Sequence, residues 1–300
     1  RNGRPDTYGL SSEGMKAFWG MSGYYPEGWI EEDGKLVHGN IQKENRDIVA
    51  MFAKWYRDGV IDPEFITGEN QGGYWAVSHD FINSKIGLTC MGYYYHWAEK
   101  TGSNTIALKQ INPNARISFG KPIKGPTGKS GMRVSGVYSH SFNVFRKGIE
   151  KEKIYKVMEI VSGINKDKDT ILSYAYGEQG KHWYYNADGL IEMKPEWKNK
   201  EFELGSGQTF YMWNNPKREE WTGIPNVVKW AQENFMYPGY TNIIYFTLPS
   251  EEKRAEADKL YNDVLIEVIT GNASLEDGDA MIEQIKENCY DQLTKEANEW

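Results

Sequence analysis

The chain has 300 residues, of which 39% are apolar and 26% are charged, and its net charge is −7. These values are typical of a globular protein of one or two domains and exclude a disordered or fibrous chain. The Lys and Arg residues are scattered among the acidic ones, which argues against a nucleic-acid-binding protein. No apolar run approaches the length of a membrane span. The opening Arg1-Asn2-Gly3-Arg4 is not a signal peptide, so we expect a removed export signal or a fragment.

Hydrophobic periodicity predicts a mixture of helices and strands. The clearest helix is residues 43–58, because Ile48, Phe52 and Trp55 share one face, and Gly59 is a natural C-terminal stop. In chain order, the other predicted elements are a helix at 11–22, a strand at 36–38 after an Asp33-Gly34 turn, a strand at 86–91, a loop at 120–131, a strand at 134–145, helices at 150–164 and 170–176, and a hairpin at 181–193 around Asp188-Gly189.

The C-terminal third is predicted to be mostly helical. Val264 and Val268 lie on one face of a helix that Gly271 would end. Ser274 and Asp277 then form a variant of the capping box, which predicts the start of the next helix. Strands mixed with helices at this spacing indicate an α/β or α+β protein.

Two short motifs are interpreted as structural. Cys90 and Cys289 form no CxxC pair and have no neighbouring His, which argues against a zinc site. An oxidising compartment would permit a disulfide between them, but two separate thiols are the preferred interpretation. Gly128-Lys129-Ser130 imitates the end of a P-loop, yet the required first glycine would fall at Ile123, so a surface turn is predicted.

No catalytic constellation stands out. The acidic pairs are adjacent in sequence and therefore point in different directions, as solvated surface residues do. A glycosidase needs two carboxylates across a sugar bond, and nothing marks such a pair. There is no GxSxG elbow, and the five His residues lack metal-ligand spacing. The sequence pattern therefore predicts no catalytic residues.

The start of the chain matches the second half of an EF-hand-like calcium loop. Asn2 takes the fifth position, the Arg4 carbonyl the seventh and Asp6 the ninth. Two upstream oxygen ligands would lie before Arg1, and Gly9 replaces the usual Glu at position 12. The alternative is a simple polar turn. We therefore expect no cofactor in this chain, and calcium only in a longer parent protein.

The aromatic content is high, with 11 Trp and 20 Tyr residues. Trp and Tyr combine a flat apolar face with a polar handle. Sugars have weakly apolar C–H faces ringed by hydroxyls, so these side chains suit carbohydrate binding. Packing in the core is the alternative role for each of them.

Several segments together resemble the extracellular solute-binding lipoproteins (family 1) of bacterial oligosaccharide ABC importers, including alginate-oligosaccharide binders. They occur in the family's order along essentially the whole chain. These segments are residues 2–9, 33–35, 56–64, 82–87, 176–182 and 269–271.

The resemblance implies an α/β fold of the type II periplasmic-binding-protein class, with two lobes that close on ligand about a hinge. It assigns residues 1–132 to the first part of the second lobe, 133–215 to a first-lobe segment and 216–300 to the C-terminal helices of the second lobe. The family's N-terminal part, with the lipid anchor, is absent from this sequence. The first lobe is therefore expected to be incomplete and to expose a core face, which a neighbouring chain could cover by dimerisation or domain swapping.

Candidate ligand-binding residues follow from position. Residues 86–91 lead into an aromatic run where sugar-binding relatives place a stacking aromatic, so Tyr94 and Trp97 are the leading candidates. The other candidate ligand-binding residues are Trp19, His96, His140 and Trp213.

The predicted function is the extracellular binding of an oligosaccharide and its delivery to an ABC-importer permease at the cell surface. Three alternatives remain open at this point: a carbohydrate-active enzyme (glycosidase or lyase), a binder of a peptide or other solute, and a structural or adhesive surface domain.

Overall fold

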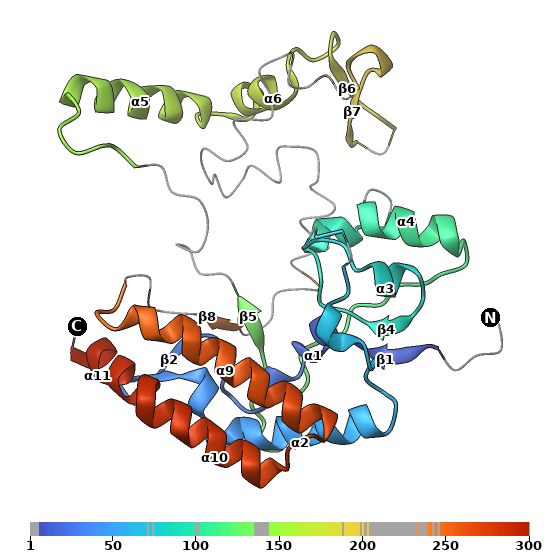
Figure 1. Ribbon diagram of the computed structural model, residues 1–300. Coiled ribbons are helices and arrows are strands. Elements are labelled where there is room, and N and C mark those ends of the chain that lie inside the picture. The colour runs from blue at the N-terminus through green and yellow to red at the C-terminus, as the bar shows by residue number, and fades with distance from the viewer. Residues whose placement is uncertain are drawn as a thin grey trace. The chain divides into compact units, whose positions relative to one another are not determined.

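The structure is a computed structural model (Figure 1). It describes residues 6–70, 72–73, 75–99, 102–134, 144–187, 189–198, 200, 203, 233, 239–241, 244 and 247–299. The chain divides into two compact units. Unit 1 comprises residues 1–139 and 235–300, and unit 2 comprises residues 140–234.

Unit 1 mixes short strands with helices. Its N-terminal elements are β1 (Tyr8–Leu10), α1 (Ser12–Met15), η1 (Trp19–Met21), β2 (Trp29–Glu32), β3 (Lys35–His38), η2 (Gly39–Ile41), η3 (Lys43–Asn45), α2 (Arg46–Arg57), η4 (Phe65–Thr67), α3 (His79–Ile82), β4 (Ile86–Leu88), η5 (Tyr94–Trp97), α4 (Ser103–Ile111) and β5 (Met132–Val134). Its C-terminal elements are β8 (Gly239–Thr241), α9 (Glu251–Thr270), α10 (Leu275–Ile285), the π-helical turn η9 (Lys286–Tyr290) and α11 (Asp291–Glu299).

The strands of unit 1 pair in twos. β1 and β4 are parallel, with Leu10 opposite Leu88, and an isolated bridge joins Leu10 to Ile61. β2 and β3 form an antiparallel hairpin. Asp33 and Gly34 form its turn with φ values of 50° and 76°, the left-handed conformations that a tight hairpin requires. β5 and β8 are parallel.

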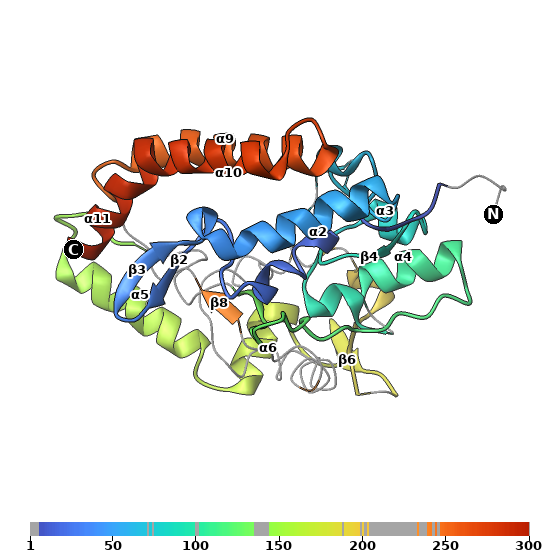
Figure 2. The same cartoon turned by 90° about the horizontal axis from the view of Figure 1, so that it is seen from below.

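The core of unit 1 lies between α2 and the C-terminal helices. Figures 1 and 2 show α9 and α10 side by side along α2. Phe52 of α2 and Leu293 of α11 are fully buried in this core. A Cβ on Gly278 would lie 2.5 Å from Val268 Cγ2, so α9 and α10 approach closely at this glycine. The two helices are joined through Gly271, which has a φ of 83°.

Unit 2 contains α5 (Lys151–Ile164), α6 (Lys168–Tyr176), β6 (Trp183–Tyr185), β7 (Ile191–Met193) and η6 (Pro195–Trp197). β6 and β7 form an antiparallel hairpin, in which Trp183 is buried and donates from Nε1 to the Gly177 carbonyl at 2.9 Å. Apolar residues occupy more than half of the circumference of α5, but Val161 is buried whereas Tyr155 and Ile160 are 69% and 50% exposed. This helix therefore exposes an apolar face.

The long periodic elements agree with the sequence. The predicted helices at 43–58, 150–164 and 170–176 correspond to α2, α5 and α6. The predicted strand at 36–38 lies in β3, and the predicted hairpin at 181–193 corresponds to β6–β7. The capping box at Ser274 and Asp277 is present. Cys90 and Cys289 are free thiols, and Gly128 lies in a turn with a φ of 79°.

Two predicted elements are wrong in extent. Residues 11–22 form only the four-residue α1 and the turn η1, because glycines interrupt this stretch and helix propensity is low at glycine. The strand at 86–91 ends at Leu88, and the Thr89 hydroxyl accepts a hydrogen bond from the Met91 amide beyond it. Of the predicted strand at 134–145, Val134 ends β5, Val144 and Phe145 lie in no strand, and residues 135–143 lie outside the described residues.

Candidate functional site

The segment after β4 carries a cluster of half-exposed aromatic rings. Trp75 and Tyr93 are 50% and 40% exposed. Their ring centroids lie 4.7 Å apart, and the angle between the ring planes is 69°. The buried His96 ring stacks on Tyr93 at 6.2 Å and meets Trp75 edge-on at 5.5 Å. We call Trp75, Tyr93 and His96 the aromatic platform. Single exposed apolar residues are ordinary, but here two large aromatic rings lie together and open to solvent.

Local hydrogen bonds hold the platform in place. The backbone amide of Tyr93 donates to His96 Nδ1 at 3.0 Å, and the amide of His96 donates to the Tyr93 carbonyl at 3.0 Å. An acceptor Nδ1 places the proton of the neutral imidazole on Nε2. Burial lowers the pKa of His96, so the ring is neutral at pH 7.

Trp97 follows the platform residue His96 in the sequence and lies in the core. It is 7% exposed, and its Nε1 donates to the Met91 carbonyl at 2.7 Å. Its ring packs edge-on against Phe81 at 5.3 Å. Gly92, with a φ of 83°, lets the chain pass close by, because a Cβ there would lie 2.8 Å from the Ala76 carbonyl oxygen and 3.2 Å from Trp97 Nε1. Trp97 therefore packs in the core and does not present its ring to solvent.

A buried carboxylate joins the segments that carry the platform. Glu69 is 1% exposed, and its Oε1 accepts from the backbone amides of Glu13 and Gly14 at 2.9 and 3.2 Å. Its Oε2 accepts from the hydroxyls of Ser78 and Thr89 at 2.7 and 2.6 Å. Glu69 thus fixes the start of α1, the loop with Trp75 and the end of β4 to one another. Burial raises the pKa of this carboxyl, while the four hydrogen bonds act in the opposite direction.

The predicted ligand-binding residues do not gather at one place in the structure. His96 belongs to the platform, and Trp97 is buried, with its Nε1 donating to the Met91 carbonyl. Trp19 lies in the core of unit 1, 7% exposed and edge-on to Phe52 at 5.3 Å. The backbone of Tyr94 begins η5, and its side chain is outside the described parts, as are His140 and Trp213.

Sequence reasoning missed Trp75, Tyr93 and Glu69. Tyr93 is adjacent to a predicted residue, and only its exposure distinguishes it. Glu69 lies between Gly68 and Asn70 in a polar stretch that reads as surface, so no local signal marks it as buried.

The predicted calcium ligands are only partly described. Asn2 and Arg4 lie outside the described residues, and Asp6 is exposed. Elsewhere in the described part of the chain, no three His, Cys, Asp or Glu side chains are grouped so as to hold a metal ion. Within the same residues, no helix is both long and apolar enough to cross a membrane.

No protein-family model matches the chain. It is 22% identical to lipoprotein LipO of Bacillus subtilis (strain 168), over 99% of this chain and 60% of LipO. It is 21% identical to an uncharacterized protein in the butB 5′ region of Niallia circulans, over 85% of this chain and 98% of that protein. The chain thus spans about three fifths of the length of LipO and nearly all of the second relative.

Among solved structures, the chain is similar to the alginate-binding protein AlgQ2, in a crystal structure without calcium ion. The TM-score is 0.54 at 12% identity, and the match covers 98% of this chain and 63% of AlgQ2. At this identity the likeness shows the fold, which is a mixed α/β fold shared with a binding protein.

Proposed function

We propose that this protein binds a carbohydrate and acts as a solute-binding protein for import. The observation that carries the proposal is the aromatic platform, in which Trp75 and Tyr93 present half-exposed rings. The chain segments next to them are joined by hydrogen bonds to Glu69. Aromatic faces suit the C–H faces of sugar rings, and the polar edges of Tyr and Trp suit their hydroxyls. The name of AlgQ2 makes alginate oligosaccharides the first ligands to test.

The ligand is an oligosaccharide, which the protein delivers to the permease of an ABC importer. The protein works outside the cell, held there by a lipid anchor, in line with the lipoprotein relative. Units 1 and 2 act as the two lobes of a periplasmic-binding-protein-like fold, and lobe closure on the ligand signals to the permease. His140 and Trp213 are proposed as further ligand contacts.

The test is isothermal titration calorimetry with a panel of alginate-derived and neutral oligosaccharides. The variants Trp75→Ala and Tyr93→Ala should each weaken binding about tenfold, the equivalent of about 1.4 kcal/mol for one lost stacking contact. Tyr155→Ala is the matched control, because Tyr155 is an exposed aromatic residue of unit 2 outside the platform. Unchanged affinity in both platform variants, or no binding by any sugar, would contradict the proposal. Turnover of a labelled oligosaccharide would favour an enzyme instead.

A further inference from the structure

His38, the last residue of β3, lies where the β2–β3 hairpin meets the C-terminal helices. Its side chain is fully buried. The ring is edge-on to that of Trp29, its cross-strand partner in β2, with ring centroids 5.0 Å apart. It also stacks on the ring of Tyr290 in the π-helical turn η9, at 4.5 Å and an angle of 28° between the planes. A charge on this ring would therefore be enclosed by aromatic side chains.

The hydrogen bonds of His38 are those of a neutral imidazole. Nδ1 accepts the backbone amide of Asn40 at 3.3 Å, which holds the start of the turn η2. An acceptor Nδ1 places the single proton on Nε2. Nε2 is buried, and no described residue accepts a hydrogen bond from it. A second proton would turn Nδ1 into a donor facing the N–H of Asn40, so protonation breaks the bond that holds the turn.

The turn held by His38 carries a polar contact between the hairpin and the C-terminal helices. Asn40 is 2% exposed, and its amide group donates to the Tyr290 hydroxyl at 2.7 Å and to Asp258 Oδ1 at 2.9 Å. Its Oδ1 accepts from the backbone amide of Glu27, which precedes β2, at 2.8 Å. The side chain of Asn40 thus joins both ends of the hairpin to α9 and η9.

The charged groups around His38 do not favour its protonated form. In the part of the chain that the structure describes, no carboxylate forms an ion pair with the ring. The Asp258 carboxylate already accepts two hydrogen bonds and lies 3.8 Å from the Arg254 guanidinium. Glu27 is paired with Arg133 at 2.8 Å. Burial first, and the positive charge of Arg254 second, therefore lower the pKa of His38.

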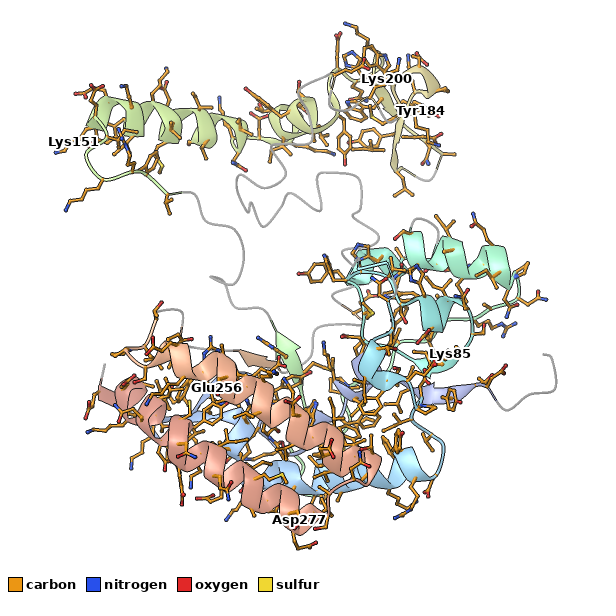
Figure 3. All side chains as sticks on the ribbon, in the orientation of Figure 1. Lys85, Lys151, Tyr184, Lys200, Glu256 and Asp277 are labelled. Carbon is orange, nitrogen blue, oxygen red and sulfur yellow. The ribbon has the colours of Figure 1, made fainter. Side chains whose placement is uncertain are left out.

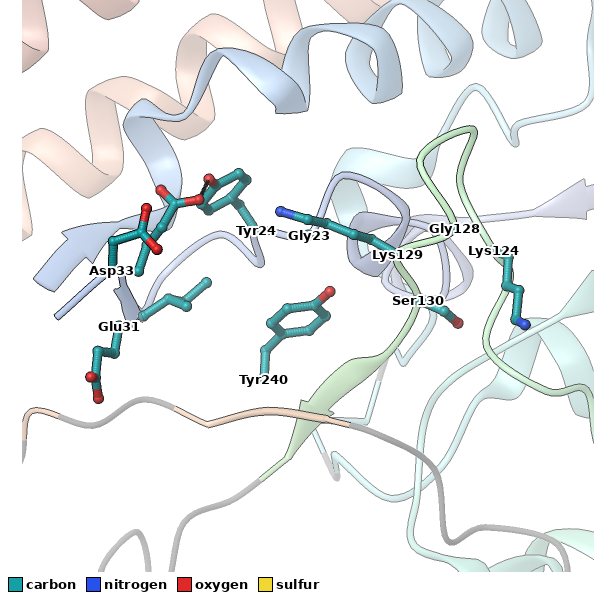
Figure 4. Close-up of a pocket in the computed structure, with 11 residues that line it drawn as sticks. Gly23, Tyr24, Glu31, Asp33, Lys124, Gly128, Lys129, Ser130 and Tyr240 are labelled. Atoms are coloured by element: carbon teal, nitrogen blue, oxygen red, sulfur yellow. Dashed lines mark hydrogen bonds between the residues drawn. The ribbon is translucent and has the colours of Figure 1, made fainter. Parts of the chain in front are cut away.

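The same hairpin forms part of the lining of a groove of about 640 Å³ (Figure 4). Ile30, Glu31 and Asp33 line the groove from β2 and the hairpin turn, and Tyr24 and Tyr240 line it from other segments. The shape of this groove therefore depends on whether the hairpin stays attached to the C-terminal helices.

We propose that His38 is an acid-sensitive latch, which the neutral ring keeps closed. Protonation releases the turn of residues 38–42, and Asn40 then leaves Asp258 and Tyr290. The hairpin detaches from α9 and η9 while the rest of unit 1 stays folded, and the groove loses its hairpin side at the same step. This control by pH does not rest on the carbohydrate binding proposed for the aromatic platform.

The size of the effect follows from the proton that the released hairpin binds. A solvated His has a pKa of about 6.5. The closed latch excludes this proton over the same range, because the pKa of His38 is lowered to about 3. Between pH 7 and pH 5 the ratio of released to closed hairpin should therefore rise about 25-fold.

Hydrogen–deuterium exchange of the whole chain, followed by mass spectrometry, tests the latch. Rates at pH 7 and pH 5, corrected for the pH dependence of the chemical exchange step, give the protection of residues 36–42 and of α10. The protection of residues 36–42 should fall about 25-fold at pH 5. It should then be about tenfold or more below that of α10, because a local opening exposes these amides more often than global unfolding does.

Two variants assign the effect to the latch. His38→Asn should remove the pH dependence at residues 36–42, because an Asn side chain can accept the Asn40 amide without binding a proton. His79→Asn is the matched control, since His79 belongs to α3 and lies outside the latch. It should keep the 25-fold effect.

Three results would overturn the inference: equal protection of residues 36–42 at pH 7 and pH 5, protection equal to that of α10 at pH 5, or the same pH dependence in His38→Asn. The first two need only the natural chain, so they decide the matter even if His38→Asn does not fold. Sugar binding at the platform is tested separately by Trp75→Ala and Tyr93→Ala, so failure of the latch is distinguishable from failure of the proposed function.

Discussion

Replacing the buried carboxylate Glu69 tests whether it anchors the aromatic platform. Glu69→Ala would leave two backbone amides and the hydroxyls of Ser78 and Thr89 without their acceptor. The hydroxyls keep a role, because each accepts a backbone amide hydrogen bond as well. A buried donor that loses its acceptor costs about 1–3 kcal/mol, so the two amides and the weakened hydroxyl contacts together should cost about 3–5 kcal/mol. This is a large part of a typical domain stability of about 5–15 kcal/mol.

Glu69→Gln should be much milder. The amide keeps the shape of the side chain and one acceptor oxygen for the two backbone amides, and the hydroxyls of Ser78 and Thr89 can rotate to accept from its NH₂ group. The expected cost is about 1 kcal/mol, and sugar binding should persist.

Urea unfolding followed by tryptophan fluorescence measures both effects. Glu64→Ala is the matched control, because the Glu64 side chain is 71% exposed. Its contact is a surface ion pair at 2.9 Å with Lys85, which is labelled in Figure 3. Such a pair contributes less than about 1 kcal/mol. A cost in Glu69→Ala no larger than that in Glu64→Ala would refute the anchoring role.

Three further predictions concern the stability of unit 1. Burial lowers the pKa of His38 to about 3, whereas the pKa in the unfolded chain is about 6.5. The neutral ring therefore contributes fully to stability above pH 6.5, and this contribution is lost as the pH falls towards 3. At pH 5 the free energy of unfolding should be lower by about 2 kcal/mol. His38→Asn should remove this difference in the free energy of urea unfolding between pH 7 and pH 5. If the difference stayed as large in the variant, other groups would be responsible for it. Gly20→Ala should destabilise by more than about 2 kcal/mol in thermal unfolding, since its Cβ would lie 2.0 Å from the Gly131 carbonyl oxygen; a near-native Tm would show that the backbone relaxes there. Ser274→Ala removes the N-cap of α10 and should cost about 1 kcal/mol, read from the urea midpoint, whereas Ser274→Gly should cost only a few tenths.

The secondary structure of the longer elements could be predicted from local pattern. The face formed by Ile48, Phe52 and Trp55 predicts α2 because a 3.6-residue repeat is visible in the sequence. The hairpin turn at Asp33-Gly34 and the capping box at Ser274 are likewise set by residues close in sequence.

The sequence indicated only the segment of the chain in which the candidate site lies, and not which of its residues are exposed. The run after β4 draws attention because aromatic residues follow a buried strand, yet Trp97 is buried and Tyr93 is half exposed. Trp75 joins Tyr93 from a separate loop, and nothing in the sequence around it indicates that partner.

The sequence by itself determined the mixture of helices and strands, the long helices and the β6–β7 hairpin, because these depend on composition and on residues within a few positions of one another. Only the tertiary structure decided which aromatic rings meet solvent and that Glu69 is buried. Burial and electrostatic environment are set by segments far apart along the chain, such as Glu13, Glu69 and Thr89. Their pairing is a property of the packed fold and leaves no mark on the local sequence.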